Sequence, residues 1–109
     1  MKASVIIPAY NSEKTIGNCI DAIRNQDFSE QYEIIVVDDG SKDETADAAE
    51  ELGAVVLKQK NSGPAKARNL GARNSKGEIL VFTDADCEPE KDWLKEMLAP
   101  FKDKEVIGV

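Results

Sequence analysis

The sequence contains no histidine and only two cysteines among its 109 residues. Without histidine, the chain lacks the commonest general base at neutral pH and the commonest ligand of transition metals. Cys19 and Cys87 lie too far apart for a zinc-binding pair, and two cysteines are too few for a disulfide scaffold. This favours a reducing, cytoplasmic setting. Any chemistry is left to Asp, Glu, Lys, Arg, Tyr or a metal held by oxygen.

Long hydrophobic runs and an excess of positive charge are also missing. No apolar stretch reaches the ~20 residues of a membrane-spanning helix, and no signal-peptide pattern opens the chain. Fourteen Lys and Arg against 21 Asp and Glu give a formal net charge of −7. This balance argues against nucleic acid or an anionic membrane as the main partner, because both need a basic face. A phosphorylated small molecule is not excluded, because a bound divalent cation reverses the local sign of the charge.

What is present is an alternation of apolar runs and amphipathic stretches, which predicts a single α/β domain over residues 1–109. The apolar runs predict strands at residues 3–8, 32–37, 54–57, 78–83 and 105–109. Helices are predicted between them: one capped by Asn11 or Ser12, one opened by a capping box at residues 41–44, one from Pro64 to about Asn74, and one from Pro89. Strand–helix alternation with apolar strands predicts a Rossmann-like parallel sheet, ordered 3-2-1-4, with helices on both faces.

Acidic residues follow two of the predicted strands directly. Asp38 and Asp39 follow the second strand, and Asp84 and Asp86 follow the fourth, where an extended backbone would point both side chains to the same side. In the predicted order, the ends of the first, second and fourth strands meet at the crevice where ligands bind in such sheets. We therefore expect these four carboxylates to lie close together.

Such a cluster suits a hard cation and a phosphate-bearing ligand. Magnesium or manganese is often held by one or two carboxylates together with substrate phosphates, and Asp84 and Asp86 fit that role. Asp38 and Asp39 are better suited to accept hydrogen bonds from a ribose or a base. Lys66 and Arg68 open the third predicted helix, where a phosphate is favoured.

Each of these motifs also has a purely structural interpretation. Asp-Asp-Gly-Ser after a strand is often only a turn and a helix cap, and Asp-x-Asp occurs in many loops by chance. Lys66 and Arg68 are also typical of a solvated helix face, and Tyr10 is as compatible with packing as with stacking on a ligand. Cys87 beside the acids is more typical of packing than of a metal ligand.

The motifs occur together and in a fixed order. They are Ser-Val-Ile-Ile-Pro-Ala-Tyr-Asn at 4–11, Ile-Val-Val-Asp-Asp-Gly-Ser-Lys-Asp at 35–43, Asn-Ser-Gly-Pro-Ala-Lys-Ala-Arg-Asn-Leu-Gly at 61–71 and Asp-Ala-Asp at 84–86. This series closely resembles the N-terminal part of family 2 glycosyltransferases, which have the GT-A fold. The resemblance spans residues 4 to about 93.

The resemblance implies a nucleotide-diphospho-sugar donor, such as a UDP- or GDP-sugar, and a Mg²⁺ or Mn²⁺ ion. Carried over by position, Pro8 and Tyr10 would lie along the base, Asp39 would accept a hydrogen bond from it, and Asp38 would sit beside it. Lys66 or Arg68 would lie near the phosphates, Asp84 would face the ribose or sugar, and Asp86 would bind the metal. An acceptor hydroxyl would then attack the anomeric carbon with inversion.

Family members run well past the end of this sequence, and their later part carries the acceptor site and the general base. The catalytic residue is therefore expected beyond Val109, and the 109 residues are expected to transfer sugar weakly or not at all. Apolar surface left uncovered would favour self-association. The intact enzyme is expected in the cytoplasm or at the cytoplasmic face of a membrane.

Three other functions fit parts of the pattern. A phospho-accepting receiver domain is also a parallel α/β module with clustered acids that bind magnesium. A sugar-phosphate nucleotidyltransferase shares the nucleotide-binding architecture, although residues 8–13 lack the glycine-rich loop expected there. A purely structural module would bind neither nucleotide nor metal.

Overall fold

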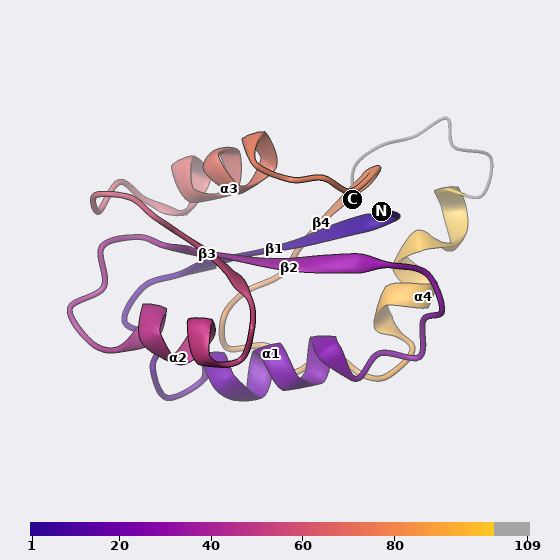
Figure 1. Ribbon diagram of the computed structural model, residues 1–109, viewed down its shortest axis with the longest axis horizontal. Coiled ribbons are helices and arrows are strands. Elements are labelled where there is room, and N and C mark those ends of the chain that lie inside the picture. Colours follow the sequence, from indigo (N-terminus) through magenta and orange to yellow (C-terminus); the bar gives the residue numbers. More distant parts are fainter. Residues whose placement is uncertain (102–109) are drawn as a thin grey trace.

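The chain forms one parallel β-sheet with helices on both faces (Figure 1). The computed structural model describes residues 1–101. The strands are β1 (Ala3–Ala9), β2 (Tyr32–Asp38), β3 (Val55–Lys58) and β4 (Ile79–Phe82). They pair in the order β3-β2-β1-β4, and every pairing is parallel. The predicted order 3-2-1-4 is confirmed, and the strand predicted at 105–109 lies outside the described residues.

Helices cover both faces of the sheet (Figure 1). The helices are α1 (Ile16–Arg24), α2 (Thr45–Glu51), α3 (Pro64–Arg73) and α4 (Trp93–Leu98), and a 3₁₀ turn, η1 (Ala99–Phe101), follows α4. In the described part of the chain, α3 lies on one side of the sheet, whereas α1, α2 and α4 lie on the opposite side. Within residues 1–101, no helix has the length and apolar character needed to cross a membrane.

Strand β1 contributes to both hydrophobic cores, because its side chains alternate between the two faces of the sheet. Val5 and Ile7 belong to the core under α1, α2 and α4, whereas Ile6 belongs to the smaller core under α3. The inward positions of the helices follow the predicted spacing. They are Ile16, Cys19, Ile20 and Ile23 on α1, and Leu94 and Leu98 on α4. Burial on both faces explains the near-continuous apolar strands of the sequence.

The predicted caps do not cap their helices. Helices α1 and α2 begin at Ile16 and Thr45, and neither has a side-chain cap. Instead, the Ser41 hydroxyl accepts a hydrogen bond from the Asn11 backbone N–H at 2.8 Å, and the Asn11 side chain accepts one from the Lys42 N–H at 2.9 Å. The predicted caps were wrong because these side chains join the loop after β1 to the loop after β2.

Helix α4 begins at Trp93, four residues later than predicted from Pro89. The side chain of Gln26, just beyond α1, accepts a hydrogen bond from the backbone N–H of Leu94 at 2.8 Å. A long-range acceptor therefore satisfies a free N–H in the first turn, which propensity alone does not anticipate.

Candidate functional site

The carboxyl ends of β1, β2 and β4 meet at one edge of the sheet. Strand β1 pairs with β2 as far as Ala9 and Asp38, and with β4 as far as Ile6 and Phe82. The backbone N–H of Asp39 donates to the carbonyl of Ala9 at 2.8 Å, which holds the end of β2 against the end of β1. The acids that follow β2 and β4 therefore flank β1 at the same edge, as the strand order predicts.

Asp39 is buried and accepts four hydrogen bonds from the loop that joins β3 to α3. Its Oδ1 accepts from the Gln59 side chain at 2.8 Å and from the Ser62 N–H at 2.7 Å. Its Oδ2 accepts from the Gly63 N–H at 3.1 Å and, more weakly, from the Asn61 side chain at 3.4 Å. One carboxylate thus ties the end of β2 to the residues that lead into α3.

These contacts keep Asp39 ionised. Its burial opposes the charged form, but the hydrogen bonds from Gln59, Ser62 and Gly63 outweigh that effect and lower the pKa of the carboxyl below its ordinary value. At neutral pH, Asp39 is therefore a fixed negative charge and a hydrogen-bond acceptor.

The side chain of Asp38 makes a structural contact within its own turn. It is buried, and its Oδ1 accepts a hydrogen bond from the Ser41 N–H at 3.1 Å, closing a turn after β2. Gly40 in this turn has φ of +76°, and a Cβ there would lie 2.9 Å from the backbone nitrogen of Asn61. The Asp-Asp-Gly-Ser motif is thus a turn, and this turn presents Asp39.

A small hollow of about 180 Å³ opens beside Asp39. Its lining is Pro8, Ala9, Tyr10, Asp39 and Pro64, and Tyr10 is 46% exposed. The structure therefore brings together three residues predicted for the base: Pro8, Tyr10 and Asp39. A larger hollow of about 350 Å³ lies near Tyr32 and Val55, but none of the predicted site residues lines it.

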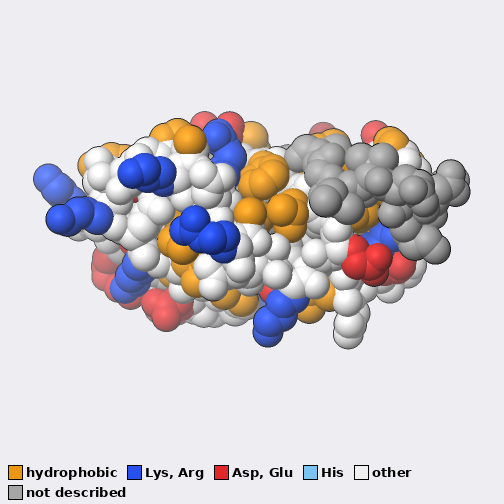
Figure 2. Space-filling view, turned by 90° about the horizontal axis from the view of Figure 1, so that it is seen from above, with side chains coloured by type: hydrophobic (Ala, Val, Ile, Leu, Met, Phe, Trp, Pro, Cys, Tyr) orange, Lys and Arg blue, Asp and Glu red, His pale blue; other side chains and the backbone are white. Residues whose placement is uncertain are grey.

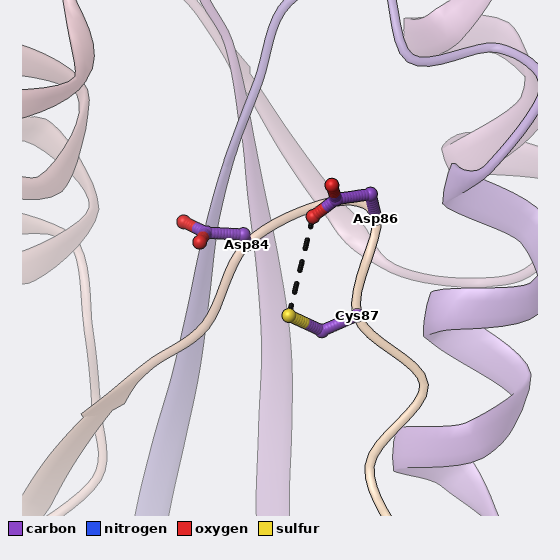
Figure 3. A group of neighbouring side chains, drawn as sticks. All are labelled: Asp84, Asp86 and Cys87. Carbon is purple, nitrogen blue, oxygen red and sulfur yellow. Dashed lines mark hydrogen bonds between the residues drawn. The ribbon is translucent and has the colours of Figure 1, made fainter.

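Asp84 and Asp86 lie on a turn rather than on the extended segment that the sequence suggested (Figure 3). The Cys87 N–H donates to the Asp84 carbonyl at 3.1 Å, which is the closure of a β-turn. Even so, one carboxylate oxygen of Asp84, one of Asp86 and the Cys87 sulfur lie within 4.8 Å of one another. The Cys87 thiol is turned toward Asp86, with Sγ 4.0 Å from Oδ1 (Figure 3).

Residues on and just beyond α1 hold the segment that runs from this turn to the start of α4. The thiol of Cys19, buried on α1, contacts the Asp84 carbonyl at 3.5 Å. The buried Gln26 donates to the Glu90 carbonyl at 2.7 Å and accepts from the Leu94 N–H at 2.8 Å. Burial, followed by the negative charges of its neighbours, raises the pKa of Cys19 to about 12, so this thiol stays protonated.

Sequence reasoning missed Gln26, Gln59 and Asn61. A signal existed for Gln26. It falls at the next inward-facing helical position after Cys19 and Ile23, where an apolar side chain would be expected. Gln59 and Asn61 follow a strand in a loop, where spacing gives no orientation.

Lys66 and Arg68 are exposed in the first turns of α3. The helix begins at Pro64, as predicted, after Gly63 with φ of +99°. Neither cation forms an ion pair within the part of the chain that the structure describes, where the salt bridge found joins Lys95 to Asp27. Both are free to meet a ligand, and their assignment to phosphate stays a prediction.

The comparisons with known proteins agree with this geometry. Residues 4–109 match the family model described as glycosyl transferase family 2. Glycosyltransferase AglE of Haloferax volcanii is 37% identical over 99 residues, which are 84% of this chain and 33% of AglE.

Two solved structures extend the likeness to three dimensions. Staphylococcus aureus TarS 1–349 in complex with UDP-GlcNAc has a TM-score of 0.85 and 38% identity, covering 94% of this chain and 32% of that one. The mannosyltransferase PcManGT from Pyrobaculum calidifontis, in complex with GDP-Man and Mn²⁺, has a TM-score of 0.81 and 32% identity, covering 90% of this chain and 32% of that one. The present chain thus spans about a third of the length of these relatives.

The alternatives can now be separated. The strand order β3-β2-β1-β4 differs from the 2-1-3-4-5 order of receiver-like flavodoxin folds, so the receiver interpretation is wrong. The nucleotidyltransferase and structural-module interpretations receive no support, because the matched relatives are named glycosyltransferases. With its parallel sheet, its acids gathered at one edge and its family match over residues 4–109, this chain belongs to glycosyl transferase family 2 and has the GT-A fold.

Proposed function

We propose that this chain is the donor-binding part of an inverting glycosyltransferase that takes a UDP- or GDP-sugar. The observation that carries the proposal is that Asp39, which lines the hollow, follows β2, whereas Asp84 and Asp86 follow β4. These two strands flank β1, so the hollow and the three carboxylates lie at one edge of the sheet. The solved structures of TarS and PcManGT, which contain UDP-GlcNAc and GDP-Man, support the class of donor.

The hollow receives the nucleobase in this proposal. Tyr10 and Pro8 offer apolar surface for a flat ring, and Asp39 offers a fixed carboxylate. An ionised carboxylate accepts hydrogen bonds and donates none. It therefore favours a base whose pairing edge carries a ring N–H, as in uracil and guanine. Asp38 contributes by holding the turn that orients Asp39.

Asp84 and Asp86 would hold the metal. Their oxygens are hard donors, both residues are exposed to an incoming ligand, and the oxygens lie close enough to share one ion. Cys87 is a soft donor and does not add to a Mg²⁺ or Mn²⁺ site. When bound, such an ion stabilises the charge that develops on the leaving nucleoside diphosphate. Asp84 is placed on the ribose or sugar side, and Lys66 and Arg68 add positive charge near the phosphates.

The acceptor site and the general base lie in this proposal beyond Val109, in the part of the relatives that this chain does not match. Little sugar transfer is therefore expected from residues 1–109 alone. A location in the cytoplasm or at the cytoplasmic face of a membrane stays a prediction.

Calorimetric titration with UDP, GDP and their sugars, with and without Mn²⁺, tests the proposal. At least one diphosphate is expected to bind, and more tightly with Mn²⁺. Replacing Asp86 by Asn removes a charged ligand at nearly constant shape, so Asp86→Asn is expected to abolish the effect of Mn²⁺. Asp47→Asn, on the exposed surface of α2, is the matched control and is expected to bind like the parent chain. Unchanged metal dependence in a folded Asp86→Asn variant would show that the metal assignment is wrong.

A further inference from the structure

The hydrogen-bonding capacity of Asp39 is nearly exhausted within the protein. An ionised carboxylate offers about four lone-pair sites, two on each oxygen. Both sites of Oδ1 are taken, one by the Gln59 side chain at 2.8 Å and one by the Ser62 N–H at 2.7 Å. On Oδ2, the Gly63 N–H takes one site at 3.1 Å. Three of the four sites are therefore filled by the protein itself.

The fourth site, on Oδ2, is only weakly occupied. The Asn61 amide lies 3.4 Å from Oδ2, beyond the range of about 2.7–3.2 Å that is typical of an N–H···O bond. The same amide donates to the main-chain carbonyl of Asp39 at 3.0 Å, so it stays anchored when the weak contact is given up. A ligand that bonds Asp39 therefore finds one available acceptor site.

Gln59 is the side chain that closes Oδ1. The other partner of Oδ1 is a backbone N–H, that of Ser62, which a change of side chain does not remove. The backbone N–H of Gln59 donates to the Asp38 carbonyl at 3.0 Å, which continues the pairing of β2 with β3 and fixes where this side chain begins. A second N–H group that approached Oδ1 from a ligand would meet the Gln59 amide, one hydrogen-bond donor against another.

Nucleobases differ in how many N–H groups they bring to a carboxylate. Uracil has one ring N–H between two carbonyls. Guanine has a ring N–H beside an exocyclic amino group, and this pair of parallel donors suits both oxygens of a carboxylate at once. A carboxylate with one available site fits the first arrangement and not the second.

We propose that Gln59 is a specificity-determining residue that restricts Asp39 to bases with a single N–H group, so that the sugar nucleotide is a UDP-sugar rather than a GDP-sugar. This inference rests on the proposed function and narrows its two classes of sugar nucleotide to one. Guanine held through its ring N–H alone leaves its amino group without an acceptor beside the Gln59 amide. An unpaired polar group costs more binding than the absence of that group, which is why guanine is disfavoured.

Titration calorimetry of the parent chain with UDP, IDP and GDP, each in the presence of Mn²⁺, tests the inference. Hypoxanthine, the base of IDP, has two rings like guanine but one N–H group like uracil. IDP therefore separates the number of N–H groups from the size of the base, and the shared diphosphate keeps the metal contribution equal. UDP and IDP are expected to bind, and GDP is expected to bind about tenfold more weakly than IDP.

Gln59→Met tests the residue. Methionine keeps the length of the side chain but has no amide, so one site on Oδ1 becomes available to the guanine amino group. The tenfold gap between IDP and GDP is expected to close in this variant. The gap is a ratio within one protein, so it is insensitive to a general loosening of the hollow. Gln31→Met, at an exposed position before β2, is the matched control and is expected to keep the gap of the parent.

The possible failures separate the inference from the proposed function. Equal affinities for IDP and GDP in the parent chain, whether tight or weak, would overturn the inference and leave the proposed function standing. A gap that persists in a Gln59→Met variant with the circular dichroism of the parent would show that Gln59 does not set the specificity. The absence of binding by all three diphosphates with Mn²⁺ would instead overturn the proposed function, and the inference with it.

Discussion

Asp39 has a structural role and, in the proposed function, also a binding role. Its carboxylate holds the loop before α3 through Gln59, Ser62 and Gly63, and it also lines the hollow next to Tyr10. The sequence indicated Asp39 because two acids follow an apolar strand. It did not indicate the donors, because they come from a loop twenty or more positions away, whose path depends on tertiary structure. A base that bonds Asp39 therefore meets an acceptor that the protein has already oriented.

Asp39→Asn is expected to destabilise the fold by about 1–3 kcal/mol at pH 7, because an amide replaces one of the two oxygens that accept from Gln59, Ser62 and Gly63 and removes the charge that strengthens these bonds. The folded pKa of Asp39 is lowered, so its contribution is complete above the unfolded value of about 3.9 and is lost as the pH falls toward the folded pKa. Urea unfolding at pH 7 and near pH 3 measures this contribution. The gap between parent and variant is expected to shrink in acid, whereas Asp21→Asn, at an exposed position on α1, is expected to match the parent at both pH values. A gap that does not depend on pH would contradict the role given to the charge.

At the scale of elements, residues on and just beyond helix α1 hold the segment that carries Asp84 and Asp86, the carboxylates proposed to hold the metal. This segment has no regular secondary structure before α4, and Cys19 contacts its start while Gln26 bonds Glu90 and Leu94 at its end. Whether a segment forms a strand or a helix was predictable from the spacing of its apolar residues, because burial on one or two faces requires apolar side chains at regular intervals. The starts of α1, α2 and α4 were not, because Ser41, Asn11 and Gln26 bond across loops instead of within their own helix turn.

Gln26→Leu tests this positioning. Leucine keeps the bulk of the side chain but cannot bond to Glu90 or Leu94, so the turn is expected to loosen. We expect a loss of about 1–3 kcal/mol in stability. We also expect weaker Mn²⁺ binding in isothermal titration at a temperature where the variant is fully folded. Gln31→Leu, at an exposed position before β2, is the control. A variant that loses stability but keeps the Mn²⁺ affinity of the parent would leave Gln26 with a purely structural role.

The close approach of α3 to the sheet gives a second prediction at this scale. A Cβ at Gly71 would lie 2.6 Å from Cγ2 of Ile6, so Gly71→Ala forces α3 away from β1. We expect a net destabilisation of about 1–2 kcal/mol from overpacking. Gly17 on α1 is the matched control, because a Cβ there meets only the Leu52 side chain, at 3.9 Å. Gly17→Ala is expected to stabilise by about 0.5 kcal/mol through helix propensity. Equal effects of the two substitutions in thermal unfolding would contradict the packing argument.

At the scale of the whole molecule, the strand order follows from rules on crossovers and parallel sheets, and it brings distant acids to one edge. The net charge was a poorer guide. A sum over the chain carries no information on where charges lie: residues 58–76 contain six Lys and Arg and no Asp or Glu. The side of the molecule that carries α3 shows Lys and Arg side chains together with Asp and Glu side chains (Figure 2).

Self-association of the chain depends on the balance between its exposed apolar surface and its net charge. Strand β3 lies at an edge of the sheet and exposes 46% of Val55, and Leu80 and Phe82 are only partly buried beside α3. An exposed apolar edge favours pairing between copies, whereas the net charge of −7 opposes it. We therefore expect concentration-dependent association in sedimentation velocity that increases with NaCl, because salt screens the repulsion. Val55→Lys is expected to reduce it, and Ala65→Lys, at an exposed position on α3, is expected to reduce it less. A monomer at all concentrations and salt levels would contradict the prediction. Association that weakens with salt would instead indicate contacts between opposite charges on two copies.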